Sequence, residues 1–165
     1  MSDLTPPAVI LDKPQLADNI GAVARVMANF GLTDLRLVSP RDGWPQDRAW
    51  ATASGADWVL EGVRVFDSVA EAIADLHTVF ATTARPRETR QPVRTPREAT
   101  HVLYDDTASG LKTGLLFGGE RARSEERFSR NAETEADISY AVFCLKKSIW
   151  RNWSATNQLD RKSVV

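Results

Sequence analysis

The densest positive charge in the chain is a short arginine-rich segment. Because three prolines interrupt it, and because proline and the residue before it avoid helix, we expect an extended loop. Arginine forks bind phosphates through paired hydrogen bonds, so the segment predicts a contact with a nucleic-acid backbone. The alternative is a surface loop whose arginines pair with Glu88, Glu98 and other carboxylates. The five arginines fall within thirteen residues: Arg85, Arg87, Arg90, Arg94 and Arg97.

A pair of glycines follows the apolar run 113–117. Gly118 and Gly119 allow backbone to approach a ligand closely or to adopt a positive φ, and Glu120 adds a carboxylate beside them. The alternative is a tight turn with a solvated charge pair. A GxGxxG fingerprint occurs neither here nor after the first apolar run, and the chain has no GxxxxGK[ST] motif. The glycines therefore do not predict a dinucleotide site or a P-loop.

Three further residues of interest lie along a helical pattern over residues 15–30. Asn19, Ala22 and Arg25 are spaced at i, i+3 and i+6, which places them loosely on one side of a helix. Gly21 costs roughly 0.5–1 kcal/mol relative to alanine inside a helix, so its presence needs a reason. Close packing against a neighbour and backbone access to a ligand would each supply one. For Arg25 the alternative is an ordinary solvated helix arginine.

The histidines and the single cysteine form no catalytic or metal-binding pattern. His77 and His101 stand apart from each other, Cys144 is isolated, and the chain has no CxxC motif. This predicts no zinc site and no disulfide framework. A local Ser-His-Asp or Cys-His signature is missing as well. We therefore expect no metal, and we expect any chemistry to depend on a cofactor held by loops.

Overall composition is that of one compact domain. The chain has 165 residues with 21 Lys+Arg and 22 Asp+Glu, and the formal net charge of −1 excludes a uniformly basic nucleic-acid binder. No apolar stretch approaches the ~20 residues of a membrane span. The N-terminus lacks a basic start followed by an apolar run, so we expect a cytoplasmic protein with no membrane segment.

Apolar runs alternate with helical patterns through the first 122 residues. Continuous apolar strands separated by helices indicate an α/β fold, a parallel sheet with helices on both faces. In such sheets, ligands bind beyond the carboxyl ends of the strands. The glycine pair and the arginine-rich segment each come directly after a predicted strand, so both are expected at this edge. The pattern predicts strands over 8–11, 35–38, 63–66, 78–83 and 113–117, and helices over 15–30, 47–56 and from 67 or 68 to about 76.

Three segments in this order carry a resemblance. Residues 14–32, centred on Asn19-Ile20-Gly21-Ala22-Val23-Ala24-Arg25, are similar to the first motif of the SpoU-type RNA 2′-O-methyltransferases of the SPOUT superfamily. Residues 115–121 resemble the second motif, with Gly119 where many members carry proline. Residues 82–85 resemble a segment that the TrmJ-like branch places beside the methyl donor. The resemblance covers residues 8–122.

Such a resemblance implies a fold, a cofactor and a substrate. In members the C-terminal end of the parallel α/β fold threads a trefoil knot, which we expect to be incomplete in this chain. They bind S-adenosyl-L-methionine in the knot and share an RNA site across a homodimer. The branch favours tRNA over rRNA. Asn19 and Arg25 would be catalytic, with Arg25 beside the target ribose; a guanidinium stays protonated, so it would orient and activate the 2′-hydroxyl without removing its proton. The cofactor pocket would be lined by Thr82, Thr83, Ala84, Gly118, Gly119 and Glu120.

Residues 123–165 depart from the family pattern. The third motif, a Ser-Asn-Leu-rich loop followed by an apolar helix, does not occur there. Arg123-Ser124-Glu125-Glu126 is what a common short-read sequencing adapter encodes when read AGA-TCG-GAA-GAG, and Asp160-Arg161-Lys162-Ser163-Val164-Val165 is the same adapter in another frame. We therefore expect residues 1–122 to be the N-terminal three quarters of the domain and the tail to be an assembly artefact on a truncated gene. The alternative is a divergent but genuine C-terminal extension.

The sequence also leaves two other functions to consider. A non-enzymatic RNA-binding α/β domain could use the loop from Arg85 to Arg97 without any cofactor. A nucleotide-binding oxidoreductase is disfavoured because the glycine fingerprint is missing. Below, "intact parent" means the product of the uninterrupted gene, which is this chain itself if the tail is genuine.

Overall fold

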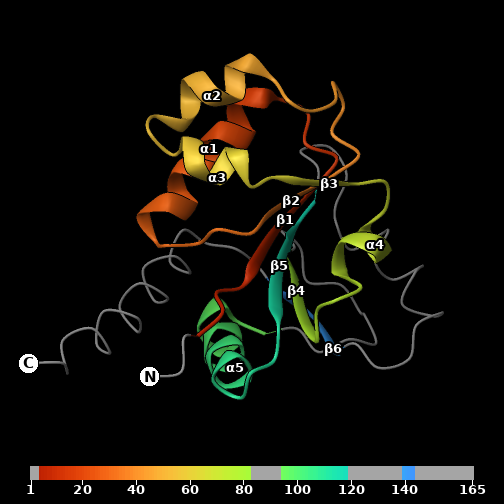
Figure 1. Ribbon diagram of the computed structural model, residues 1–165. Coiled ribbons are helices and arrows are strands. Elements are labelled where there is room, and N and C mark those ends of the chain that lie inside the picture. Colours follow the sequence, from red (N-terminus) through yellow and green to blue (C-terminus); the bar gives the residue numbers. More distant parts are fainter. Residues whose placement is uncertain (1–3, 83–93, 119–138, 144–165) are drawn as a thin grey trace, which may run out of the picture.

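A parallel sheet forms the centre of the molecule. The computed structural model describes residues 4–82 and 94–118, together with the backbone of residues 139–143. Within these residues six strands pair in parallel in the order β3-β2-β1-β5-β4-β6 (Figure 1). The predicted parallel sheet is confirmed. The strands are β1 (Ala8–Asp12), β2 (Leu35–Val38), β3 (Arg64–Phe66), β4 (Thr78–Thr82), β5 (Thr113–Phe117) and β6 (Ser139–Phe143).

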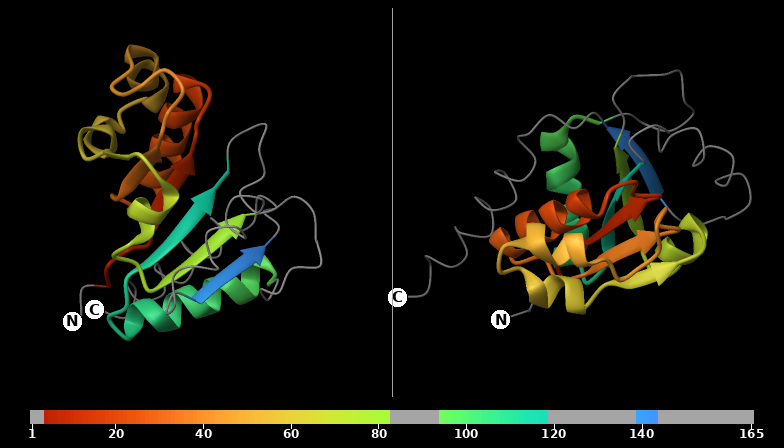
Figure 2. Two further views of the ribbon diagram at one scale, coloured as in Figure 1. Left: turned by 90° about the vertical axis from the view of Figure 1, so that its right-hand side faces the viewer. Right: turned by 90° about the horizontal axis from the view of Figure 1, so that it is seen from above.

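Helices cover both faces of this sheet, as the sequence pattern predicts. Alternate residues of β1 enter different cores: Val9 and Leu11 pack with α1, α2, α3 and α5, whereas Ala8 and Ile10 pack with α4. The two further views in Figure 2 show α1 and α5 as separate helices over different strands. The helices are α1 (Ala17–Asn29), α2 (Asp47–Ala53), α3 (Asp57–Glu61), α4 (Val69–Ile73) and α5 (Pro96–Ala108).

The helix α5 corrects the expected loop at its C-terminal end. Arg97 lies in the first turn of α5, so the prediction of an extended segment as far as this arginine is wrong. Pro96 occupies an opening position of the helix, where its missing N–H and fixed φ are tolerated. Thr95 and Glu98 form a reciprocal capping box around it. The spacing Thr-Pro-x-Glu is typical of a helix start. The sequence analysis missed it because it treated all three prolines as part of a loop.

Smaller differences concern the second helical pattern. The predicted helix over 47–56 is shorter in the structure: α2 ends at Ala53, because Ser54 and Gly55 adopt positive φ values of 50° and 87°. The helix α3 that follows was not predicted. Ser68, one of the two predicted caps, is the N-cap of α4: its hydroxyl accepts a hydrogen bond from the Glu71 amide. The helix ends at Ile73, before the predicted end near residue 76. The strand β6 lies within the segment that the sequence analysis assigns to a tail, and it pairs in parallel with β4. None of the helices in the described residues is long and apolar enough to cross a membrane.

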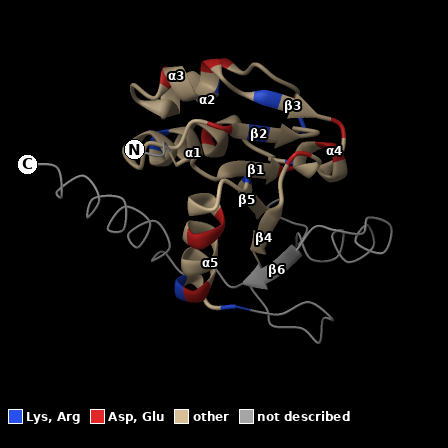
Figure 3. Cartoon of the chain, turned by 60° about the horizontal axis from the view of Figure 1, so that its bottom comes forward, with Lys and Arg blue, Asp and Glu red and all other residues tan. Residues whose placement is uncertain are grey.

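An ion network lies where the strands begin, an edge of the sheet that we call the amino edge. Figure 3 marks the acidic and basic residues of the described chain in red and blue. Arg36 is 2% exposed, and its guanidinium donates to the Ala72 carbonyl at 2.6 Å, to Asp34 at 2.7 Å and to Asp75. Arg64 and Lys112 extend the network by ion pairs with Asp34 and Asp75. This cluster ties the start of β2 to the end of α4.

The same contacts shift the acidity of both carboxyl groups. The hydrogen bond from Arg36 is the main reason that the pKa of Asp75 falls to about 2, against the opposing effect of burial. For Asp34 burial is the largest single influence and acts to raise the pKa, but hydrogen bonds and charges from Arg36 and Arg64 outweigh it and lower the pKa. The amino edge therefore holds both carboxylates ionised to low pH.

Candidate functional site

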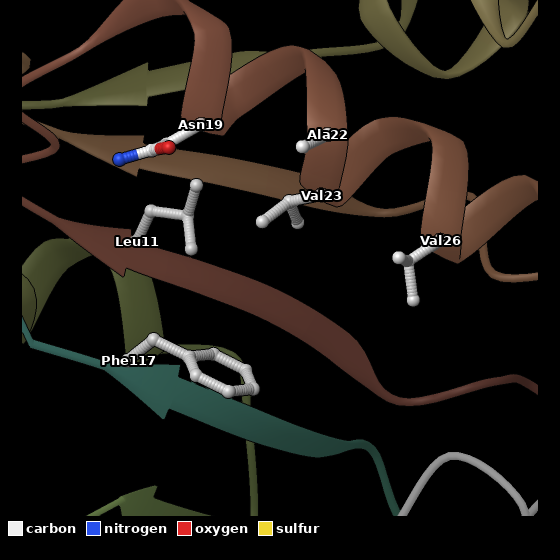
Figure 4. Close-up of a pocket in the computed structure, with 6 residues that line it drawn as sticks. All are labelled: Leu11, Asn19, Ala22, Val23, Val26 and Phe117. Atoms are coloured by element: carbon white, nitrogen blue, oxygen red, sulfur yellow. The ribbon is translucent and has the colours of Figure 1, made fainter. Parts of the chain in front are cut away.

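The opposite edge, where the strands end, carries a cavity, and we call it the carboxyl edge. The cavity has a volume of about 330 Å³ and lies between α1 and the ends of β1 and β5. Figure 4 shows the apolar side chains from α1, β1 and β5 turned into it, with the Asn19 amide at one side. Such a site suits a ring that is largely apolar and carries a few polar groups. The lining residues are Leu11, Asn19, Ala22, Val23, Val26 and Phe117.

Gly21 explains how α1 is held beside the cavity. A Cβ at this position would overlap Thr52 Oγ1 and the Ala49 carbonyl oxygen of α2. Thr52 also donates to the Asp18 carbonyl at 3.2 Å, which ties α2 to the first turn of α1. Of the two reasons left open by the sequence, close helix packing is therefore the one that the structure supports. It fixes the rotation of α1 and turns Asn19 toward the cavity.

The three residues spaced along α1 separate into two groups. Asn19 and Ala22 both line the cavity, whereas Arg25 is exposed and is not among the lining residues. An interval of six residues rotates a side chain by more than a half turn, which takes Arg25 round to the solvent side of the helix. Arg25 could meet a substrate that lies over α1, but it does not point into this cavity.

Two predicted cofactor residues lie at the ends of neighbouring strands. Thr82 is the last residue of β4 and Gly118 directly follows β5, and both are half-buried. Because Ala81 pairs with Leu116, the ends of β4 and β5 lie side by side at the carboxyl edge. Thr83, Ala84, Gly119 and Glu120 lie outside the described residues, so their predicted roles stay predictions.

The predicted RNA contacts are only partly within the described chain. Arg94 and Arg97 are exposed, just before and within the first turn of α5. Since α5 follows β4 along the chain, its first turn lies toward the carboxyl edge. Arg85, Arg87 and Arg90 lie outside the described residues.

Several site residues were missed from the sequence. The cavity walls formed by Leu11, Val26 and Phe117 read as ordinary core residues, and nothing in their types distinguishes them. Asp12, the last residue of β1, ends at the same edge of the sheet but does not line the cavity. Asp12 is only 4% exposed. Among the described residues no group of three or more His, Cys, Asp and Glu is arranged to hold a metal ion.

The fold and this site define a class of protein. The chain belongs to the SpoU rRNA Methylase family, whose family model matches residues 6–140. The resemblance drawn from the three sequence motifs is thereby confirmed.

Within this family, the chain is similar to proteins named TrmJ. The chain is 37% identical over 114 residues to the tRNA (cytidine/uridine/adenosine-2'-O-)-methyltransferase TrmJ of Pseudomonas aeruginosa, an alignment that covers 69% of this chain and 44% of the relative. The crystal structure of TrmJ from Z. mobilis ZM4 is 36% identical with a TM-score of 0.77, covering 95% of this chain and 81% of that one.

A more distant structure shares the fold. The SpoU methyltransferase AviRb from Streptomyces viridochromogenes, solved in complex with AdoMet, is 15% identical with a TM-score of 0.61, over 94% of this chain and 62% of that one. The chain spans about half the length of the curated relatives that it matches, 44% and 49% for two of them.

Proposed function

We propose that the intact parent of this chain is a tRNA ribose 2′-O-methyltransferase that uses S-adenosyl-L-methionine. The observation that carries this proposal is the cavity beside α1 at the carboxyl edge, with Asn19 of the first motif on its wall and Phe117 of the second motif opposite. Two motifs that are almost a hundred residues apart in the sequence thus meet at one site. The names of the TrmJ relatives support tRNA as the substrate.

The ends of two neighbouring strands support the proposed binding of the methyl donor. The ends of β4 and β5 at Thr82 and Gly118 lie beside each other, and Gly118 has no side chain to obstruct a ligand. When bound, S-adenosyl-L-methionine supplies an activated methyl group on a sulfonium. We assign its binding to Thr82, Thr83, Ala84, Gly118, Gly119 and Glu120.

The protein's own contribution to methyl transfer is positioning and exclusion of water. The apolar walls of the cavity exclude water from one side of the site. Asn19 offers an amide that can orient a ribose or base by hydrogen bonds. Arg25 on the exposed side of α1 would hold the phosphate next to the target ribose and favour the developing alkoxide. As a protonated guanidinium it accepts no proton.

The proposal includes an assembly and a cellular location. We propose that the intact parent is a cytoplasmic homodimer, whose RNA site extends to Arg85, Arg87, Arg90, Arg94 and Arg97. We also keep the proposal that residues 123–165 are an assembly artefact that replaces the third motif. Sequencing a clone that spans the codon of Ala122 tests it: an uninterrupted natural reading frame through residue 165 would establish the tail as genuine.

The activity is tested by mapping ribose methylation in total tRNA. Deleting the parent gene should remove one or a few 2′-O-methyl groups, and the purified intact parent with S-adenosyl-L-methionine should restore them. Retained methylation in the deletion strain would refute the assignment. If the intact parent binds tRNA but gives no heat with S-adenosyl-L-methionine in calorimetry, it is a binding domain and not an enzyme. If the tail is an artefact, the 165-residue chain should bind the cofactor weakly or not at all.

A further inference from the structure

Two tryptophans stack on each other beside the carboxyl edge of the sheet. Trp44 lies in the loop that leads from the end of β2 to α2, and Trp50 lies within α2. Their ring centroids are 6.5 Å apart, and their planes are inclined by 23°. Both side chains are half-buried against the core. Trp44 therefore packs one side of its ring on Trp50 and keeps part of its surface open to solvent.

Hydrogen bonds fix the loop that carries Trp44. The Gln46 side chain donates to the Gly43 carbonyl at 2.6 Å, which closes the loop around the tryptophan. The Arg41 amide donates to the Pro14 carbonyl at 3.2 Å, which joins this loop to the one before α1. The ring is thus held in place before any ligand arrives, and a preorganised surface loses less entropy on binding.

One side of α1 connects this loop with Arg25. Residues seven apart complete almost two turns of a helix, so Asp18 and Arg25 point in nearly the same direction. Asp18 faces α2, because its carboxylate pairs with Arg48 and its carbonyl accepts a hydrogen bond from Thr52. Figure 1 shows α2 beside α1. An RNA strand that contacts Arg25 therefore has α2 and its tryptophan stack next to it.

Charges around the stack balance. The Arg41–Asp42 and Arg48–Asp18 ion pairs have lengths of 2.8 and 3.1 Å. A region with as many carboxylates as cations attracts phosphates little, so a contact with RNA here depends on the aromatic ring and not on net charge. Residues 13–20 and 39–50 hold three cations and three carboxylates: Lys13, Arg41, Arg48, Asp18, Asp42 and Asp47.

We propose that Trp44 stacks on an unpaired base of the RNA substrate, through the part of its ring that Trp50 leaves open. This inference rests on the proposed function and extends the RNA site beyond the arginines assigned to it. Stacking on an aromatic side chain strengthens the binding of single-stranded nucleic acid by roughly 5- to 100-fold per base. Every base has a π-face, so the contact requires a base free of its pairing partner but not a particular base.

Exposure alone does not distinguish Trp44, as a second tryptophan shows. Trp58 on α3 is 46% exposed, and Asp57 and Glu61 lie beside it on the same short helix. Because α3 leads into β3, its last residues lie toward the amino edge. Trp58 thus has an open ring without the position at the carboxyl edge, which makes it a matched control.

The test is filter binding of total tRNA from the deletion strain by the intact parent across a salt series. Trp44→Leu keeps an apolar side chain but cannot stack, so it should weaken binding by roughly 10-fold at every salt concentration. Trp44→Phe keeps an aromatic ring and should lose less than about 3-fold. Neither variant should change the salt slope, because neither removes a phosphate contact. Trp58→Leu should leave affinity and slope unchanged.

Each other outcome has a definite meaning. An unchanged affinity for Trp44→Leu, an equal loss for Trp44→Phe, or an equal loss for Trp58→Leu would overturn stacking at Trp44 and leave the proposed function standing. An unmodified parent that binds no tRNA would overturn the proposed function and this inference with it. If Trp44→Leu does not fold, tryptophan fluorescence decides: total tRNA should quench the unmodified parent more than Trp44→Phe, and equal quenching would refute the proposal.

Discussion

The two edges of the sheet differ in what they hold: an ion network at the amino edge and an apolar cavity at the carboxyl edge. At the amino edge Arg36 is surrounded by Asp34, Asp75 and the Ala72 carbonyl, so its charge is compensated within the fold. At the carboxyl edge a cavity of about 330 Å³ opens between α1 and the ends of β1 and β5, and its walls are almost entirely apolar. The difference indicates that stability is concentrated where the strands begin and ligand binding where they end. Changes at one edge should therefore affect stability and changes at the other should affect function.

The largest effect is expected from removing the central charge of the amino edge. Arg36→Ala leaves two carboxylates facing each other and opens space beneath α4, so we expect a loss of about 3–5 kcal/mol in the free energy of unfolding. Urea unfolding of the intact parent measures it. The control is Arg64→Ala, which removes a half-exposed partner of the same network and should cost less than about 1 kcal/mol. If Arg36→Ala instead changed cofactor affinity in the folded protein, the division between the edges would be wrong.

A complementary loss of function is expected at Arg25. Arg25→Ala in the intact parent should reduce single-turnover methyl transfer by roughly 10²–10³-fold, the scale of one lost transition-state donor, and leave S-adenosyl-L-methionine affinity nearly unchanged. Arg25→Lys should recover little, because an ammonium cannot span a hydroxyl and a phosphate as a planar fork does. Arg48→Ala is the matched control, since Arg48 is exposed on the neighbouring α2 and pairs with Asp18. A normal rate for Arg25→Ala at saturating RNA and cofactor would show that Arg25 is a surface residue.

A change in the packing of α1 should affect both stability and methyl transfer. Gly21→Ala forces α1 and α2 apart, and we expect a loss of roughly 1–3 kcal/mol in stability together with a misplaced Asn19. Combining it with Thr52→Ala should restore little, because the Ala49 carbonyl would still overlap the new methyl group. The control is Gly62→Ala, where an added Cβ meets its nearest neighbour at 3.7 Å and should be tolerated. Thermal unfolding and methyl transfer rates, measured on the same samples, show whether both properties fall together.

Sequence patterns predicted the sheet well and the site only in part. The apolar runs at β1, β2, β4 and β5 are buried on both faces, so their composition alone identified them as parallel strands. The helix α5 was missed because its first residues, Pro96 and Arg97, were interpreted with the preceding prolines as a loop.

The cavity could not be predicted for a different reason. Its walls are Leu11, Val26 and Phe117, whose types are the same as those of core residues, and only the register of β1 against β5 brings them together. Gly21 was recognised as unusual, but the partner that makes it necessary, α2, lies about thirty residues further along the chain. Local spacing carries no information about such contacts.

Acid should weaken the amino edge. The pKa of Asp75 is lowered to about 2 in the folded protein and that of Asp34 is lowered as well, so both groups stabilise the fold above their ordinary pKa values. The contribution of Asp75 is lost as the pH falls toward about 2. The Asp75 side chain is 40% exposed, so solvent screens the pair and we expect a loss of only about 1 kcal/mol from this group. Urea unfolding of the intact parent at pH 5 and pH 2.5 measures it. Asp75→Asn should flatten this dependence, and an equally steep dependence in that variant would contradict the assignment.

The smallest effect, and the most selective test of the two edges, concerns the salt dependence of RNA binding. Each phosphate neutralised by an arginine releases counterions, so the logarithm of the affinity falls linearly with the logarithm of the salt concentration. Arg94→Ala and Arg97→Ala should each reduce this slope by about one unit at most. Arg97 lies in the first turn of α5, where the helix dipole disfavours a cation, so its position is not explained by helix stability. Lys112→Ala removes a positive charge from the amino edge and should leave the slope unchanged. Filter binding of tRNA by the intact parent across a salt series gives all three slopes. Equal changes for Lys112→Ala and Arg97→Ala would mean that RNA contacts both edges, and the division of labour across the sheet would then hold for the cofactor but not for the RNA.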